Sequence, residues 1–209
     1  MSVAIETQPR LVIEPREQVS VTVPSDVRLM VSVDDFERLC RDNRDLRLER
    51  NAEGELIVMS PSGSESGAIN AILTARLVLW SVSNRSGVAF DSSAGFTLPN
   101  GSVRSPDASW IKFDRWNALT DKQREGFAPI VLDFVVELCS PSDSRPEIRA
   151  KMVEYLEQGA RLGWLIDPKT KEVEISRQGR PVEILKSPRT VSGEDVLPGF
   201  TLDLNEIFD

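Results

Sequence analysis

The sequence contains no histidine, and this absence excludes several common catalytic designs. Without an imidazole there is no Ser-His-Asp or Cys-His arrangement, no histidine-bound zinc and no histidine general base. Any proton transfer in this protein must therefore use aspartate, glutamate, lysine, water or the single tyrosine, Tyr155.

Cysteine is also scarce, and long apolar runs are missing. Cys40 and Cys139 are the only cysteines in 209 residues, too few for a disulfide framework, and their apolar neighbours favour buried thiols over a redox or metal role. No apolar run approaches the ~20 residues that span a bilayer. The first ten residues lack the basic and apolar regions of a secretion signal. We therefore expect a cytoplasmic protein without a membrane span.

Positive charge is in deficit, since the formal net charge is −8. This disfavours strong nonspecific binding to DNA, which depends on Lys and Arg neutralising phosphates. A local basic strip can still act within an acidic molecule, so a nucleic-acid enzyme is not excluded.

The length and the hydrophobic content of 40% fit one globular domain. Residues 1–28, with three prolines and the β-type run V-S-V-T-V, read as an N-terminal arm that a partner chain could order. We expect the remaining residues, 29–209, to form a single domain.

Hydrophobic periodicity and turn residues predict a mixed fold of helices and strands. Helices are expected at about 33–43, 64–85, 116–127 and 146–158, a hairpin at 46–59, and further strands at 88–91, 95–98, 107–111, 130–138, 164–167, 173–176 and 182–185. The segment 130–138 is the most apolar and is therefore predicted to be a central strand.

Asp107 and Glu137 are the first candidates for a functional site. Asp107 begins a predicted strand and Glu137 stands near the end of the apolar strand, so both carboxylates can converge if the strands are neighbours. Asp107 could instead cap a turn after Ser-Pro. Glu137 could instead form an internal salt bridge with Arg149 or Arg161, because a buried carboxylate needs a partner or a purpose.

Lys151 and Glu65 complete the candidate set. Lys151 lies at the edge of the apolar stripe of its predicted helix, where it could also keep its charge in water while burying its stem. Glu65 lies on the inward stripe of the 64–85 helix, but Ser62 and Glu65 also match a capping box. Arg76 on that stripe is expected to pair with an acid such as Glu49.

Taken in order, these residues favour a metal-dependent hydrolase. Two carboxylates supply the hard oxygen ligands that Mg²⁺ prefers, and an ammonium can orient the attacking water. Paired carboxylates also serve glycoside hydrolysis, but that chemistry leaves Lys151 without a role.

The chain also resembles a bacterial family of restriction-endonuclease-like proteins, the Uma-two family, within the PD-(D/E)xK nuclease superfamily. The resemblance covers roughly residues 30–209 and rests on M-S-P-S-G-S-E-S-G (59–67), F-T-L-P-N-G-S-V-R-S-P-D-A-S-W (96–110) and V-V-E-L-C-S-P-S-D (135–143). It continues through 151–168 and 197–204.

The resemblance implies an α/β (α+β) fold with a restriction-endonuclease-like core, a mixed central β-sheet flanked by helices. It also implies a Mg²⁺- or Mn²⁺-dependent endonuclease acting on DNA, with Asp107 and Glu137 as metal-binding acids. The superfamily's usual lysine, two residues after the second acid, is replaced by Cys139, and Lys151 could take its place. Many relatives carry a histidine near Glu65, which this chain lacks.

Two further expectations follow. We expect a homodimer, because cutting both strands of a DNA duplex needs two active sites. The competing hypothesis is a member that keeps the fold as a binding or assembly module without catalysis, supported by the net charge of −8 and by Cys139. Affinity for Mg²⁺ or Mn²⁺ would favour the endonuclease, and no affinity for either ion would favour the non-catalytic module.

Overall fold

The computed structural model describes residues 27–141 and 143–208, so the predicted arm at 1–28 lies almost wholly outside the described residues. The helices are α1 Val33–Asp42, α2 Ser64–Asn84, α3 Phe113–Asn117, α4 Asp121–Glu125, α5 Arg145–Gln158 and α6 Asn205–Phe208. The strands are β1 Arg47–Arg50, β2 Leu56–Met59, β3 Gly87–Asp91, β4 Phe96–Thr97, β5 Val103–Arg104, β6 Ala108–Lys112, β7 Phe134–Leu138, β8 Leu162–Asp167, β9 Glu172–Arg177, β10 Glu183–Lys186, β11 Thr190–Ser192 and β12 Thr201–Asp203.

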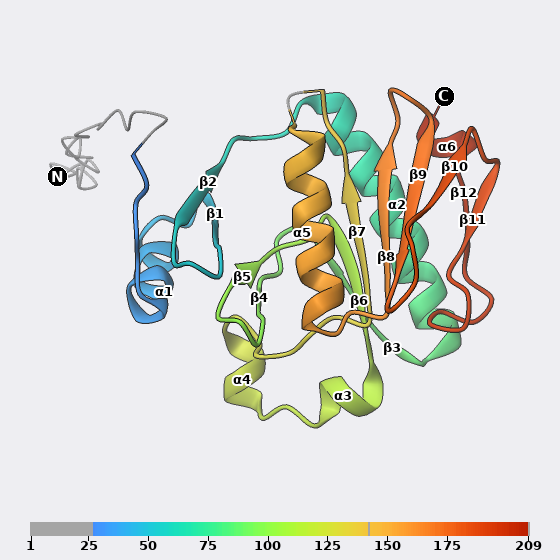
Figure 1. Ribbon diagram of the computed structural model, residues 1–209. Helices are drawn as coiled ribbons and strands as arrows, with labels where there is room; N and C mark the ends of the chain where they lie inside the picture. Colours follow the sequence, from blue (N-terminus) through green and yellow to red (C-terminus); the bar gives the residue numbers. More distant parts are fainter. Residues whose placement is uncertain (1–26, 142, 209) are drawn as a thin grey trace, which may run out of the picture.

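A mixed sheet with the strand order β10-β9-β8-β7-β6-β3 forms the centre of the molecule (Figure 1). The β7–β8 pair is parallel and the other pairs are antiparallel. Every residue of β7 is buried, as expected for the apolar strand that was predicted to be central. The mixed sheet flanked by helices confirms the predicted fold class.

Alternation along the strands divides the core into two layers. Phe134 and Val136 of β7 pack with Leu73 and Leu77 of α2, whereas Val135 packs on the opposite face with the α5 side. The two helices therefore cover opposite faces of the sheet (Figure 1). Glu137 alternates with Val136 and shares the α5 face with Val135.

A smaller sheet with the order β2-β1-β5-β4 lies beside the central one. The hairpin of β1 and β2 was predicted, with Gly54 in its turn at φ +95°. The strand expected at 95–98 is shorter, Phe96–Thr97, and it pairs with the unpredicted strand β5 instead of extending the central sheet. Turn residues 99–102 fold the chain back at once, which limits both strands to two residues.

The single helix predicted at 116–127 is wrong, because α3 ends at Asn117 and a second short helix, α4, begins at Asp121. Thr120 is the cause, since its hydroxyl accepts from the Gln123 N–H and the Gln123 side chain accepts from the Thr120 N–H. This capping box starts a new helix in the middle of the segment.

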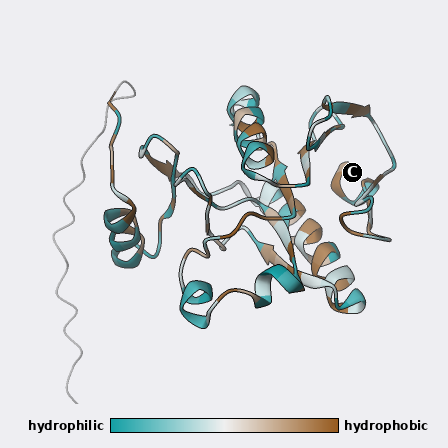
Figure 2. Ribbon diagram, turned by 60° about the horizontal axis from the view of Figure 1, so that its bottom comes forward, coloured by the Kyte–Doolittle hydropathy of each residue, from teal (hydrophilic) through white to brown (hydrophobic). Residues whose placement is uncertain are grey.

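Helix α2 is the one helix in the described ranges that is long and apolar enough to span a membrane, by length and composition alone. Its inner face instead packs Leu73 and Leu77 into the core, as in a globular protein. Hydropathy colouring shows mostly hydrophilic residues on α1, α3 and α4 (Figure 2).

Gly87 of β3 allows an unusually close approach to β6, and it provides a stability test. A Cβ at this position would lie 2.3 Å from the Ile111 carbonyl oxygen and 2.3 Å from the Trp110 ring. We expect Gly87→Ala to lower the free energy of unfolding by about 2–3 kcal/mol, because strands in a packed core cannot separate without cost. Urea denaturation measures this loss, with Gly126→Ala as the control because its Cβ would meet open space. Equal stabilities of the two variants would contradict the close packing.

Candidate active site

Asp107 and Glu137 lie opposite each other at one end of the central sheet. The β6–β7 register pairs Ala108 with Val136, and one further step along the antiparallel pair sets Asp107 against Glu137. Directly opposed residues of an antiparallel pair project from the same face, with Cβ atoms about 5 Å apart. The predicted convergence of the two acids therefore follows from the register.

One oxygen of each acid is engaged and one is not. Asp107 Oδ2 accepts from the Leu138 N–H at 2.8 Å, and Glu137 Oε1 accepts from the Tyr155 hydroxyl at 3.1 Å. Within the described part of the chain, no protein group donates to Asp107 Oδ1 or Glu137 Oε2. The pair thus offers two unused carboxylate oxygens on one face.

Lys151 of α5 reaches this pair. Its Nζ lies 2.9 Å from Glu137 Oε1, and the side chain is only 13% exposed. The salt-bridge partners proposed from the sequence for Glu137 were wrong, because Arg149 pairs with Glu174 and Arg161 with Asp195. The stem of Lys151 is buried and so is its charge, which excludes the snorkelling alternative.

The first turns of α5 are tied to the sheet by arginines. Arg145 Nη2 lies 2.7 Å from both Glu172 Oε2 and Glu174 Oε1, and Arg149 binds Glu174 at 2.6 Å. These contacts hold the N-terminal part of α5, just before Lys151, against the sheet. Ser144 and Glu147 match the S-x-x-E pattern of a capping box, but the Ser144 side chain makes no cap hydrogen bond.

Glu49 of β1 is a member of the site that the sequence did not reveal. Its Oε1 lies 2.8 Å from Lys151 Nζ and accepts from the Ser105 N–H at 2.8 Å. Arg104 Nη1 contacts the other oxygen at 3.1 Å, and its Nη2 binds Glu154 at 2.7 Å. Arg76, the partner expected for Glu49, pairs instead with Glu206.

Burial and charge oppose each other in this cluster. Burial alone would raise the pKa of Glu49, but Lys151 and Arg104 outweigh it and lower that pKa. Burial alone would lower the pKa of Lys151, yet Glu137 and Glu49 raise it, so the amine stays charged.

The two facing acids resist ionisation. Burial raises the pKa of Glu137 to about 7, against the pull of Lys151 and with the help of the neighbouring Asp107 charge. Burial also raises the pKa of Asp107, although the Leu138 N–H and Lys151 act against it. A bound cation would relieve this unfavourable ionisation.

Glu65 is not joined to the cluster. It lies exposed in the first turn of α2 and makes no ion pair within the described ranges. The capping alternative is not supported either, because Gly63 is the N-cap and no side-chain cap hydrogen bond forms. The N-terminus of α2 nevertheless lies at the same end of the molecule as the N-terminus of α5 and the C-terminal end of β7 (Figure 1).

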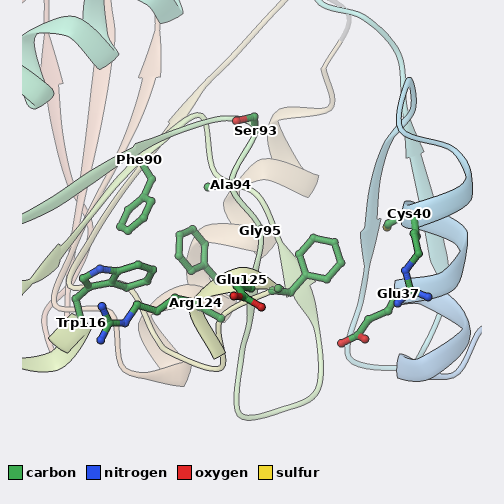
Figure 3. A pocket seen from close by; sticks show the side chains of 14 residues that line it. Glu37, Cys40, Phe90, Ser93, Ala94, Gly95, Trp116, Arg124 and Glu125 are labelled. Atoms are coloured by element: carbon green, nitrogen blue, oxygen red, sulfur yellow. The ribbon is translucent and has the colours of Figure 1, made fainter. Parts of the chain in front are cut away.

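A separate cavity of about 510 Å³ lies away from these acids, between α1 and the α3–α4 segment (Figure 3). Its lining includes Phe90, Trp116, Arg124, Glu37 and Cys40. None of the predicted site residues lines it. Cys40 and Cys139 are both partly exposed, so the prediction that both are buried is wrong.

Comparison with known families places the chain in one of them. The Uma2 family, described as "Putative restriction endonuclease", matches residues 33–205. The chain belongs to the Uma2 family. The match confirms the resemblance drawn from the sequence motifs.

A solved structure agrees with this assignment at the level of fold. A chain from Anabaena variabilis ATCC 29413, described as "a putative nuclease belonging to DUF820", superposes with a TM-score of 0.72 at 21% identity, covering 85% of this chain and 97% of that one. No curated protein matches the sequence. The fold is therefore shared with a nuclease-like protein.

The donor set of this Uma2 protein suits a hard divalent ion. Among the described residues, no group of three or more acid or cysteine side chains is clustered closely enough to hold a metal. Mg²⁺, however, is commonly bound by one or two carboxylates, with waters and substrate phosphates completing the shell. The unused oxygens of Asp107 and Glu137 fit that pattern, and soft ligands are not among them.

Proposed function

We propose that this protein is a divalent-metal-dependent endonuclease that hydrolyses phosphodiester bonds in DNA. The observation that carries the proposal is the position of Asp107, directly before β6, opposite Glu137 of the neighbouring strand β7, with the Lys151 ammonium 2.9 Å from Glu137. Membership of a nuclease family supports the reaction class.

Asp107 and Glu137 would hold Mg²⁺ or Mn²⁺ through their free oxygens. Such an ion supplies charge stabilisation to a phosphoryl group and lowers the pKa of water. Lys151 would orient the attacking water and stabilise the negative charge that develops on the phosphate. Glu65, exposed at the start of α2, would assist through a water molecule.

A homodimer and a cytoplasmic location belong to the same proposal. Two copies would present two sites to the two strands of a duplex, as a symmetric dimer does. With a net charge of −8, DNA must be held by local cations and by the metal, so binding should weaken steeply with salt.

Plasmid cleavage with Mg²⁺ or Mn²⁺ tests the function. We expect Asp107→Asn to reduce the cleavage rate by about 100-fold, because the substitution removes a ligand charge. Asp114→Asn is the matched control, since Asp114 is a surface acid whose side chain is 80% exposed. Equal cleavage by both variants would assign the activity to another site or to a contaminant.

The alternative is a binding or assembly module without catalysis. It is favoured by Cys139, which stands where the nuclease superfamily usually has lysine. Calorimetry separates the two functions, because a module of this kind would show no affinity for Mg²⁺ or Mn²⁺.

A further inference from the structure

Arg47 begins β1 and faces the same way as Glu49. The two residues are separated by one position, and alternate residues of a strand project from one face. Glu49 accepts from the N–H of Ser105, two residues before Asp107. The face that Arg47 shares is therefore directed at the chain that leads into the acid pair.

A hydrogen bond places the Arg47 guanidinium more closely. Its Nη2 donates to the Ser92 carbonyl at 3.2 Å. Ser92 directly follows Asp91, the register partner of Ala108, and Asp107 directly precedes Ala108. Arg47 thus lies beside Asp107, and its charge acts to lower the pKa of that acid.

Arg47 differs from the other arginines around the site. Arg104, Arg145 and Arg149 each form ion pairs with carboxylates. In the part of the chain that the structure describes, Arg47 forms no ion pair, and its single hydrogen bond goes to a neutral carbonyl. A guanidinium carries five N–H donors, so most of them stay unused, and the residue is partly exposed.

We propose that Arg47 binds a backbone phosphate of DNA next to the Asp107–Glu137 pair. The planar fork of arginine matches the oxygens of a phosphodiester. An acid pair repels a phosphodiester, and a cation beside it offsets that repulsion. The inference rests on the proposed function, because it names a contact to the same substrate.

The test is the affinity for a fluorescein-labelled DNA duplex, measured by anisotropy over a series of KCl concentrations. We expect Arg47→Gln to weaken binding about tenfold or more. The plot of log association constant against log [KCl] has a negative slope, and its magnitude should decrease by about 0.9, the value for one lost phosphate contact. Arg44→Gln removes the same charge from an exposed residue three positions earlier, and it should leave that slope unchanged.

The outcomes separate the two proposals. A wild-type protein that neither binds nor cleaves DNA overturns both. Wild-type binding with the same slope for Arg47→Gln and Arg44→Gln overturns the role of Arg47 and leaves the nuclease proposal standing. If Arg47→Gln fails to fold, Arg47→Lys decides the matter. It keeps the charge but loses the fork, and it should bind more weakly than wild type, whereas unchanged affinity refutes the contact.

Discussion

Replacing Lys151 with methionine should lower the free energy of unfolding by about 3–5 kcal/mol and slow DNA hydrolysis by about 100- to 1,000-fold. The amine lies 2.8 Å from Glu49 and 2.9 Å from Glu137. Its removal leaves two buried carboxylates without their shared cation. The same change removes the positive charge that we propose acts on the phosphate during hydrolysis.

Urea denaturation and plasmid cleavage measure the two effects separately. Lys122→Met is the control, because Lys122 is exposed on α4 and forms no ion pair in the described ranges. The double variant Glu49→Gln, Lys151→Met should lose less stability than the sum of the single changes, since it leaves fewer unpaired charges. Full stability of Lys151→Met would show that the buried ion pairs contribute nothing.

The second large effect is a loss of stability with rising pH that Glu137 causes. Its pKa rises from 4.5 to about 7 in the folded protein. Between these values the folded state binds a proton that the unfolded state has released, so this group stabilises the fold below about pH 4.5 and loses that contribution as pH rises through 7. The loss amounts to ~3 kcal/mol for the full shift.

Thermal unfolding from pH 5 to pH 8 measures the loss, and Glu137→Gln should flatten the profile. Mn²⁺ should raise the melting temperature more at pH 8 than at pH 5.5, because the ionised acid binds the ion and the protonated acid does not. Asp114→Asn should keep the wild-type profile. A wild-type stability that rises steadily from pH 5 to pH 8 would contradict the raised pKa.

The sequence predicted those parts of the site that depend on local periodicity. The sequence predicted that Asp107 and Glu137 converge if their strands are neighbours, and β6 and β7 do pair. Lys151 could be placed at the edge of its helix by the 3.6-residue period.

Glu49 and Arg104 could not be found in this way. Glu49 contacts Lys151 across 102 residues of sequence, and nothing in the run L-R-L-E-R shows that its strand turns one face to α5. The argument that a glutamate in an apolar strand needs a partner applies to Glu137, but Glu49 stands in the charged strand R-L-E-R and gives no such signal. The pairing of Glu49 with Arg76 that was expected from the sequence is wrong, because Arg76 pairs with Glu206 and Glu49 with Lys151.

Turn and cap chemistry limited the prediction of the fold. The helix pattern at 116–127 was continuous enough to hide the capping box of Thr120 and Gln123. The S-x-x-E matches at Ser62 and Ser144, in contrast, formed no side-chain caps. A short capping motif shows that a side-chain cap can form at that position. The packing of neighbouring elements decides whether the cap does form.

Glu174 receives both Arg145 and Arg149, and it stands on β9, two strands away from β7. It is therefore a remote anchor for α5, the helix that carries Lys151. Variation on that strand can loosen or tighten the lysine without touching the acids. Substitutions at Glu174 therefore offer a way to alter the setting of Lys151 while Asp107 and Glu137 keep their own contacts.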